Sequence, residues 1–470
     1  MSIFRKTALS AALVSLLLAS TQPVSAETVA GAMAKTYANN PDLNAARAAL
    51  RAIDENVTIA KAAMRPQVNG VAEANATRRQ FDKDCAVAPI AGLGCTQPLG
   101  RSDTFTSSFG VSITQQIFDG FQTLNRVRSA EANVLSNREA LRSQEINLLL
   151  SAVEAYSNIW RDQAIVIIRK QNLEFLREQL NASNARLQVG EGTQTDVSLA
   201  EAQLAEAQAL LVSAQAALKT SEAVYFQIVG DQPTNIRQPQ PATRGIPKTL
   251  DQAVAIGMRE HPQILSAQRA VDSAGYNVKA AEGTMLPGVS IQGDVFKSIN
   301  GSNSTNDSVS GSISARVTVP LYQGGAEYGQ IRQAKERLGQ QRILVDSARL
   351  EVQQTIISAH TQLEAARAAI RANQAEIQAA NLALQGVVEE RNVGQRTTLD
   401  VLIAQQTVLD AQESLVLSQR VEVVASYSLL ASMGQLTVRS QNLKVAEYRA
   451  EEHYEAVKDK WFGLRTVDGR

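Results

Sequence analysis

Residues 117–120 read IFDG, residues 186–197 read RLQVGEGTQTDV, and the 70-residue run between them, from Gly120 to Gly190, contains no proline. The same frame returns where LYQGG at 321–325 and RNVGQRTTLDV at 391–401 enclose a second proline-free run of 70 residues, from Gly324 to Gly394. A helix of that length rises about 1.5 Å per residue and would reach roughly 100 Å. The sequence therefore predicts an elongated architecture rather than a compact globule.

Apolar residues in both runs keep a seven-residue spacing that is interrupted once. The spacing jumps by four residues after Ala155, and again after Ala359 in the second run. A heptad seam predicts helices in a left-handed supercoil, which a four-residue insertion unwinds locally. Seam and jump recur at a constant offset of 204 residues, which indicates an internal duplication. The seam positions are Val127, Val134, Leu141, Leu148, Ala155, Ile159, Val166, Leu173, Leu180 and Leu187, then Ile331, Leu338, Val345, Val352, Ala359, Leu363, Ile370, Ile377 and Leu384.

The duplication includes the segments that precede the long runs. Thr28–Leu43 aligns with Thr249–Ile264 at an offset of 221 residues, which also carries Pro41 to Pro262. An alanine-rich segment of about 25 residues follows each of these prolines and ends at another proline, which predicts a helix that stops there. Upstream of the first copy, residues 1–26 combine basic, apolar and small-residue regions in the order of a secretory signal peptide.

Apolar and small polar residues alternate after each closing proline, as in half-buried strands. Weaker strands are expected at 67–78 and 288–297. Alternating segments of about ten residues are typical of transmembrane β-barrels, and about eight strands is the practical minimum for closure. The four strands of one chain therefore have to combine with the strands of other copies. Two copies would give eight strands, and three copies would give twelve. The clearest alternation places Phe105, Phe109, Val111 and Ile113 in one segment, and Val309, Ile313, Ala315, Val317 and Val319 in the other.

Composition and motifs exclude several functional classes. The chain has 46 Lys and Arg against 46 Asp and Glu, so its formal net charge is +0 and nothing favours nucleic-acid binding. No GxxxxGK[ST] phosphate-binding loop is present, so energy for transport would have to come from a partner. No nucleophile–base–acid arrangement or metal-ligand spacing stands out, and we predict no catalytic site, metal or cofactor.

Taken together, IFDG, VPLYQGG and the paired VGxxTxxDV tips make the chain resemble the TolC family of outer-membrane channels over essentially all of residues 27–470. The resemblance implies a mainly α fold with a transmembrane β-barrel: a homotrimer whose twelve-stranded barrel, four strands per chain, joins a long periplasmic α-helical barrel. It also implies passive export in complex with a periplasmic adaptor and an inner-membrane pump of the RND or ABC type. Outer-membrane lipid would surround the barrel.

The resemblance and the repeats together predict the domain organisation. The first repeat, 27–230, holds a helix, two strands in 67–118, a long helix at 120–190 and a returning helix at 193–230. An equatorial linker at 231–248 follows. The second repeat, 249–434, holds a helix, two strands in 288–320, a long helix at 324–394 and a returning helix at 397–434. Residues 435–470 form a C-terminal equatorial segment and tail.

The residues of the two tips have a structural and a functional interpretation. Gly190 and Gly394 suit the left-handed position that ends a helix, while Thr193 with Asp196 and Thr397 with Asp400 have capping-box spacing. The resemblance implies instead a periplasmic gate, in which Arg396 links to Thr195 and Asp196, and Asp400 forms a ring of carboxylates. Such a ring favours cations. Two family positions differ here: a second aspartate is replaced by Ile403, and a tyrosine by Arg391.

Cys85 and Cys95 lie ten residues apart in a loop expected to face the exterior, where an oxidising environment favours a disulfide between them.

Two rival functions remain from the sequence alone. A periplasmic structural coiled coil or adaptor without a pore would share the signal peptide and heptads, but it has no need of four barrel-type strands. An exported hydrolase lacks a recognisable catalytic pattern. Within the channel interpretation, the sequence does not separate multidrug efflux from type I protein secretion.

Overall fold

The computed structural model describes residues 27–80, 101–300 and 307–469. The predicted signal peptide at 1–26 and the pair Cys85 and Cys95 lie outside the described residues. The chain divides into two compact units: the first holds residues up to Leu50, Asn137–Ala267 and Val345–Ala450, and the second holds Arg51–Ser136, Gln268–Leu344 and Glu451–Arg470. Each unit therefore takes segments from both sequence repeats.

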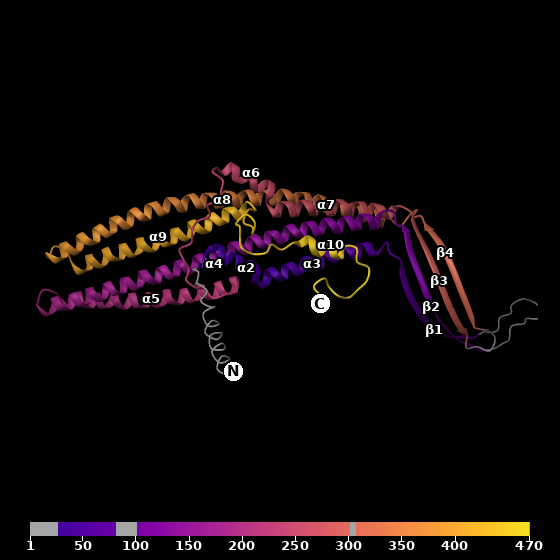
Figure 1. Ribbon diagram of the computed structural model, residues 1–470, viewed down its shortest axis with the longest axis horizontal. Helices are drawn as coiled ribbons and strands as arrows, with labels where there is room; N and C mark the ends of the chain where they lie inside the picture. Colours follow the sequence, from indigo (N-terminus) through magenta and orange to yellow (C-terminus); the bar gives the residue numbers. More distant parts are fainter. Residues whose placement is uncertain (1–26, 81–100, 301–306, 470) are drawn as a thin grey trace, which may run out of the picture. The chain divides into compact units, whose positions relative to one another are not determined.

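Two helices of equal length form the longest elements of the chain (Figure 1). Helix α4 covers Gln122–Gln188 and α8 covers Ala326–Asn392, and each has 67 residues. Returning helices follow both, α5 at Gln194–Val229 and α9 at Thr398–Ser432. Asp119 of the IFDG motif starts α4, since its carboxylate accepts a hydrogen bond from the backbone N–H of Thr123 at 2.6 Å.

Burial of the predicted seam confirms the heptad interpretation. The jump residue Ile159 is fully buried and its counterpart Leu363 is 2% exposed. These residues belong to the apolar core of the first unit, which also includes parts of α2 (Val29–Asn39), α6 (Leu250–Glu260) and α9. Polar links cross between the repeats there, because Arg169 on α4 pairs with Glu413 on α9, with Nη2 to Oε2 at 2.8 Å.

The second unit contains a four-stranded antiparallel sheet with strand order β1-β2-β3-β4. Its strands are β1 at Gln67–Gln80, β2 at Arg101–Phe118, β3 at Gly288–Asn300 and β4 at Ser308–Thr318. The β2–β3 pairing shifts by one residue between Gln116 and Phe118, as at a β-bulge. Strands β1 and β4 are the edges, and each leaves one row of backbone hydrogen-bonding groups without a strand partner in the described part of the chain.

Register places most apolar side chains of the four strands on one face, which confirms the predicted alternation, while Val71 and Phe296 lie on the other face opposite Gly110. Val68 lies opposite Ile113, and Val111 lies opposite both Gly70 and Val295. The other face is mainly small and polar, with pairs such as Asn69 and Ser112. Apolar residues on the shared face are exposed: Val68, Phe105, Phe109, Val111, Ile113, Ile291, Val295, Ile299, Val309, Ile313 and Val317.

Shorter helices precede the sheet in both repeats. Helix α3 covers Pro41–Ala62, and its counterpart α7 covers Pro262–Glu282, followed by the short 3-10 helix Gly283–Met285. Gly120 (φ +68°) sits against this turn, where a Cβ at position 120 would lie 2.3 Å from the carbonyl oxygen of Gly283. The equivalent Gly324 (φ +72°) has nothing within 4 Å of its Cβ position. The two junctions thus share a backbone conformation but differ in packing.

The C-terminal tail contains helix α10, Ala450–Val457, which the sequence patterns do not predict. Within the second unit, α10 contacts α3 through His453, whose Nδ1 lies 2.9 Å from Oδ2 of the buried Asp54. In the described part of the chain, no helix combines the length and the hydropathy needed to cross a bilayer.

Candidate gate at the two helical tips

Both long helices end in the same hydrogen-bonded turn, and both tips belong to the first unit. Gly190 (φ +80°) donates its N–H to the carbonyl of Leu187 at 3.1 Å, and the next residue, Glu191, donates to Arg186 at 2.9 Å. Gly394 (φ +78°) and its neighbour repeat these two bonds at the end of α8. This is the Schellman motif, whose left-handed residue favours glycine because a Cβ is penalised there.

Capping boxes begin both returning helices. At the start of α5, the Thr193 hydroxyl accepts from the Asp196 N–H at 3.2 Å, while an Asp196 carboxylate oxygen accepts from the Thr193 N–H at 3.1 Å. Thr397 and Asp400 make the same reciprocal pair at the start of α9, at 3.3 and 2.8 Å. Asp therefore fills the position that Glu or Gln usually holds in this motif.

These contacts fix the charge state of the tip carboxylates. Hydrogen bonds from the Thr193 hydroxyl and backbone lower the pKa of Asp196, and the Thr398 hydroxyl from the other tip adds to the effect. Hydrogen bonds from the Thr397 backbone and hydroxyl likewise lower the pKa of Asp400, with a smaller contribution from the charge of Arg396. A lowered carboxyl pKa means that both groups are ionised at neutral pH.

Arg396 lies within reach of a carboxylate that the sequence patterns do not single out. Its Nε donates to Oε2 of Glu390 at 2.8 Å, and this bond raises the pKa of Arg396. Among the described residues of one chain, Arg396 makes no bond to Thr195 or Asp196. Thr195 and Ile403 are both exposed.

Further polar bonds connect the two tips through side chains that the sequence does not identify. Arg391, which is 9% exposed, donates through Nη1 to the Gln179 side chain on α4, and Arg186 donates to Asn392 at 3.3 Å. Burial lowers the pKa of Arg391, and the nearby positive charge of Arg186 lowers it further. Arg391 thus joins α8 to α4. One arginine shortly before each VG, Arg186 in the first tip and Arg391 in the second, was the available signal for these bonds.

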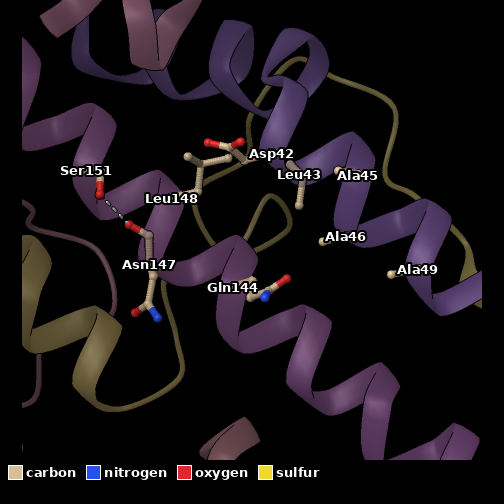
Figure 2. A pocket seen from close by; sticks show the side chains of 9 residues that line it. All are labelled: Asp42, Leu43, Ala45, Ala46, Ala49, Gln144, Asn147, Leu148 and Ser151. Carbon is tan, nitrogen blue, oxygen red and sulfur yellow. Dashed lines mark hydrogen bonds between the residues drawn. The ribbon is translucent and has the colours of Figure 1, made fainter.

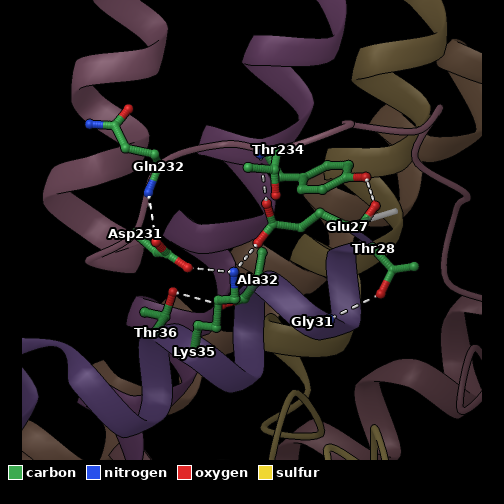
Figure 3. Close-up of polar contacts among 10 residues, drawn as sticks. Glu27, Thr28, Gly31, Ala32, Lys35, Thr36, Asp231, Gln232 and Thr234 are labelled. Atoms are coloured by element: carbon green, nitrogen blue, oxygen red, sulfur yellow. Dashed lines mark hydrogen bonds and ion pairs between the residues drawn. The ribbon is translucent and has the colours of Figure 1, made fainter. Parts of the chain in front are cut away.

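A second polar cluster ties the start of the described chain to the linker after α5 (Figure 3). Lys35 Nζ donates to Glu27 Oε1 at 2.9 Å and to Asp231 Oδ2 at 2.7 Å. Burial lowers the Lys35 pKa, but these two hydrogen bonds outweigh it and leave the pKa raised. The Tyr156 hydroxyl lies 2.6 Å from the Glu27 carbonyl oxygen, and burial raises its pKa to about 12. We interpret the cluster as structural, because each charged group in it has a partner from this chain.

An open groove of about 580 Å³ lies between α3 and α4 in the first unit (Figure 2). Alanines at positions 45, 46 and 49 leave this space on the α3 side, and Leu148 and Gln144 border it on the α4 side. Of its lining residues only Asp42 is titratable, so the groove is suited to packing rather than to chemistry. In the described part of the chain, no group of three or more His, Cys, Asp or Glu side chains is placed to hold a metal ion.

Comparison with known proteins identifies this architecture. The family model described as "Outer membrane efflux protein" matches residues 33–231 and 258–435. The outer membrane efflux protein BepC of Brucella suis biovar 1 (strain 1330) is 46% identical over 451 residues, which cover 96% of this chain and 94% of that protein. The alkaline protease secretion protein AprF of Pseudomonas aeruginosa is 27% identical over 67% of this chain and 66% of its own length.

A solved structure shows the same fold. The outer membrane protein VceC of Vibrio cholerae superposes with a TM-score of 0.71 at 20% identity, covering 86% of this chain and 96% of that one. The family model matches once in each repeat, which agrees with the duplicated elements, and the resemblance drawn from the junction and tip motifs is confirmed. The chain belongs to the outer membrane efflux protein family.

Proposed function

We propose that this protein is the outer-membrane exit duct of a tripartite export system, which passes compounds from an inner-membrane pump to the exterior. The sheet is the observation that carries the proposal. Most of its apolar side chains share one exposed face, its other face is mainly small and polar, and both edges lack a strand partner among the described residues. A lipid-facing surface, a hydrated inner surface and edge pairing between copies account for these three features together.

The proposed assembly is a homotrimer, in which three sheets pair edge to edge. In this assembly the long helices would lie in the periplasm, where a periplasmic adaptor and an RND or ABC pump would supply the energy. We propose that the chain carries out no catalysis, in keeping with a family of transport proteins. The alternative of a periplasmic coiled coil or adaptor without a pore leaves the exposed apolar face and the open sheet edges without a role.

Small toxic compounds are the substrates that we favour over secreted proteins. BepC is named as an efflux protein and AprF as a protease secretion protein, and this chain is more similar to BepC over more of its length. Deletion of the gene should increase sensitivity to several unrelated antibiotics and leave the secreted proteins in the culture medium unchanged. Loss of a secreted protein with unchanged antibiotic sensitivity would assign the duct to type I secretion instead.

We propose that the tips form the gate, with Arg396 and Glu390 as one of its polar bonds and with Asp400, Asp196 and Thr195 around the opening. Single-channel conductance in planar bilayers tests the duct and the gate together. The native protein should give a small conductance, and Arg396→Ala should raise the open probability because it removes the Glu390 ion pair. Arg371→Ala is the matched control, because Arg371 is an exposed arginine on α8, away from the tip, without a carboxylate partner among the described residues.

Three results of this experiment are distinct. A conductance that rises only in Arg396→Ala supports both proposals. A native pore that neither variant changes keeps the duct and removes Arg396 from the gate. A stable oligomer in the outer-membrane fraction that forms no pore would contradict the duct itself.

A further inference from the structure

The last described residues of the second unit expose large apolar side chains. Within Lys460–Val467, here called the C-terminal hook, Phe462 is 85% exposed and Leu464 is fully exposed. Trp461 is 57% exposed and Val467 is 48% exposed. Contiguous exposed apolar groups of this size mark a surface that contacts something else.

The hook is held in place at both ends by contacts with α3. Its apolar side chains are therefore exposed on a segment whose position is fixed. Before the hook, α10 lies along α3, and Val457 at its end is 1% exposed. After the hook, Asp468 pairs with Arg51. The contacts with α3 are His453 Nδ1 with Asp54 Oδ2 at 2.9 Å, the Thr58 hydroxyl with the Val457 carbonyl at 2.7 Å, Lys61 Nζ with Asp459 Oδ1 at 2.7 Å, and Arg51 Nε with Asp468 Oδ2 at 3.6 Å.

These contacts place the hook beside the beginning of the sheet. Arg65 lies two residues before β1, donates through Nη1 to the Lys460 carbonyl at 2.9 Å, and stacks 4.6 Å from the centre of the Trp461 ring. In Figure 1 the yellow C-terminal loop accordingly lies near the end of α3 from which β1 begins. The other connections between helices and strands also expose apolar side chains: Met64, Phe121, Leu286, Leu321 and Tyr322. The hook therefore continues an apolar zone at the helix-side ends of the strands.

Charge on the hook is positive once its ion pairs are taken into account. The acidic residues on either side of it, Asp459 and Asp468, pair with bases on α3. Among the described residues no carboxylate pairs with Lys460 or Arg465, and the Lys460 ammonium donates to the Arg465 carbonyl at 2.7 Å. Aromatic side chains flanked by unpaired bases are typical of segments at the boundary between lipid headgroups and acyl chains.

We propose that the C-terminal hook is an interfacial membrane anchor. Trp461, Phe462 and Leu464 insert into the phospholipid leaflet that surrounds the helix-side ends of the strands, and the bases of the hook contact lipid phosphates. This inference rests on the proposed function, because it requires the sheet to span the outer membrane. It commits to a bilayer as the occupant, since the hook lies beside the beginning of a sheet with an exposed apolar face, and its charge complements anionic headgroups.

Two tryptophans in the chain provide a probe and its control. In Trp160→Phe the fluorescence reports on Trp461 alone, and in Trp461→Phe it reports on Trp160 of α4 in the first unit. Both full-length variants are reconstituted into vesicles of phosphatidylethanolamine and phosphatidylglycerol, with and without bromine on the upper part of the acyl chains. We expect brominated lipid to quench most of the Trp461 emission and to leave the Trp160 emission unchanged.

Other outcomes overturn the anchor and separate its failure from that of the duct. Trp461 emission that aqueous iodide quenches and brominated lipid does not would place the hook in water. A blue-shifted Trp461 that neither agent quenches would place it against protein, such as a second copy of this chain. If the same vesicles conduct ions, either result removes the anchor and leaves the duct standing, whereas vesicles without conductance would count against the proposed function.

Discussion

At the scale of single residues, the tip aspartates show how one carboxylate can cap a helix and also place negative charge at the proposed pore opening. Both hydrogen bonds from Thr397 to Asp400 end on the same oxygen, Oδ2. No donor among the described residues contacts Oδ1 of Asp400. One oxygen therefore starts helix α9, while the ionised group as a whole still presents negative charge. The structural and the functional interpretations of Asp400 are compatible.

Replacing Asp400 in two ways separates these roles. Asp400→Asn retains an acceptor oxygen for Thr397, so the tip should keep its stability to within about 1 kcal/mol, while the loss of charge should reduce the cation preference of the pore. Asp400→Ala should lower both. Reversal potentials in a KCl gradient measure selectivity, and hydrogen exchange at the start of α9 measures stability. Asp346→Asn, which removes a charge on α8 away from the tips, should change neither. A reversal potential that Asp400→Asn does not alter would exclude the carboxylate from the ion path.

The sequence predicts the caps but not the side-chain bonds within and between the tips, for a physical reason. A Schellman turn and a capping box are local, so Gly190, Gly394 and the Thr–Asp pairs can be identified from spacing alone. The partners of Arg396 and Arg391 depend on how one turn folds back and on which helix lies alongside. Glu390 and Gln179 therefore become visible only in the structure.

At the scale of elements, the two repeats build the same helices with different surroundings. Gly120 and Gly324 both adopt a left-handed backbone before a long helix, yet only Gly120 is packed against another turn. Helix α10 is missed from the sequence because eight residues carry little periodicity and its position depends on contacts with α3. Local pattern thus predicts the long elements, while tertiary contacts decide the junctions and the tail.

These two glycines form a matched pair for mutation. Gly324→Ala should cost only the left-handed strain, about 1–2 kcal/mol. Gly120→Ala should cost more, because its new methyl group would also meet the Gly283 carbonyl and the Leu286 side chain. Thermal dissociation of the oligomer on gels, with yield in the outer-membrane fraction, measures the difference. Equal losses in both variants would show that backbone strain alone explains the glycines.

At the scale of the whole molecule, function requires an assembly that the single chain only implies. A four-stranded sheet with two open edges needs partner strands from other copies. Because each copy brings four strands, the smallest closed barrels would have eight or twelve strands. An eight-stranded barrel is about wide enough for side chains to fill its interior, whereas a larger barrel leaves a lumen. An exit duct must pass substrate, so we expect twelve strands and three chains. Native mass spectrometry in detergent should give the mass of three processed chains, and the same preparation should conduct ions. The mass of two chains would indicate an eight-stranded barrel whose interior is filled by the side chains of the polar face. Such a barrel would not conduct ions, and this result would contradict the duct.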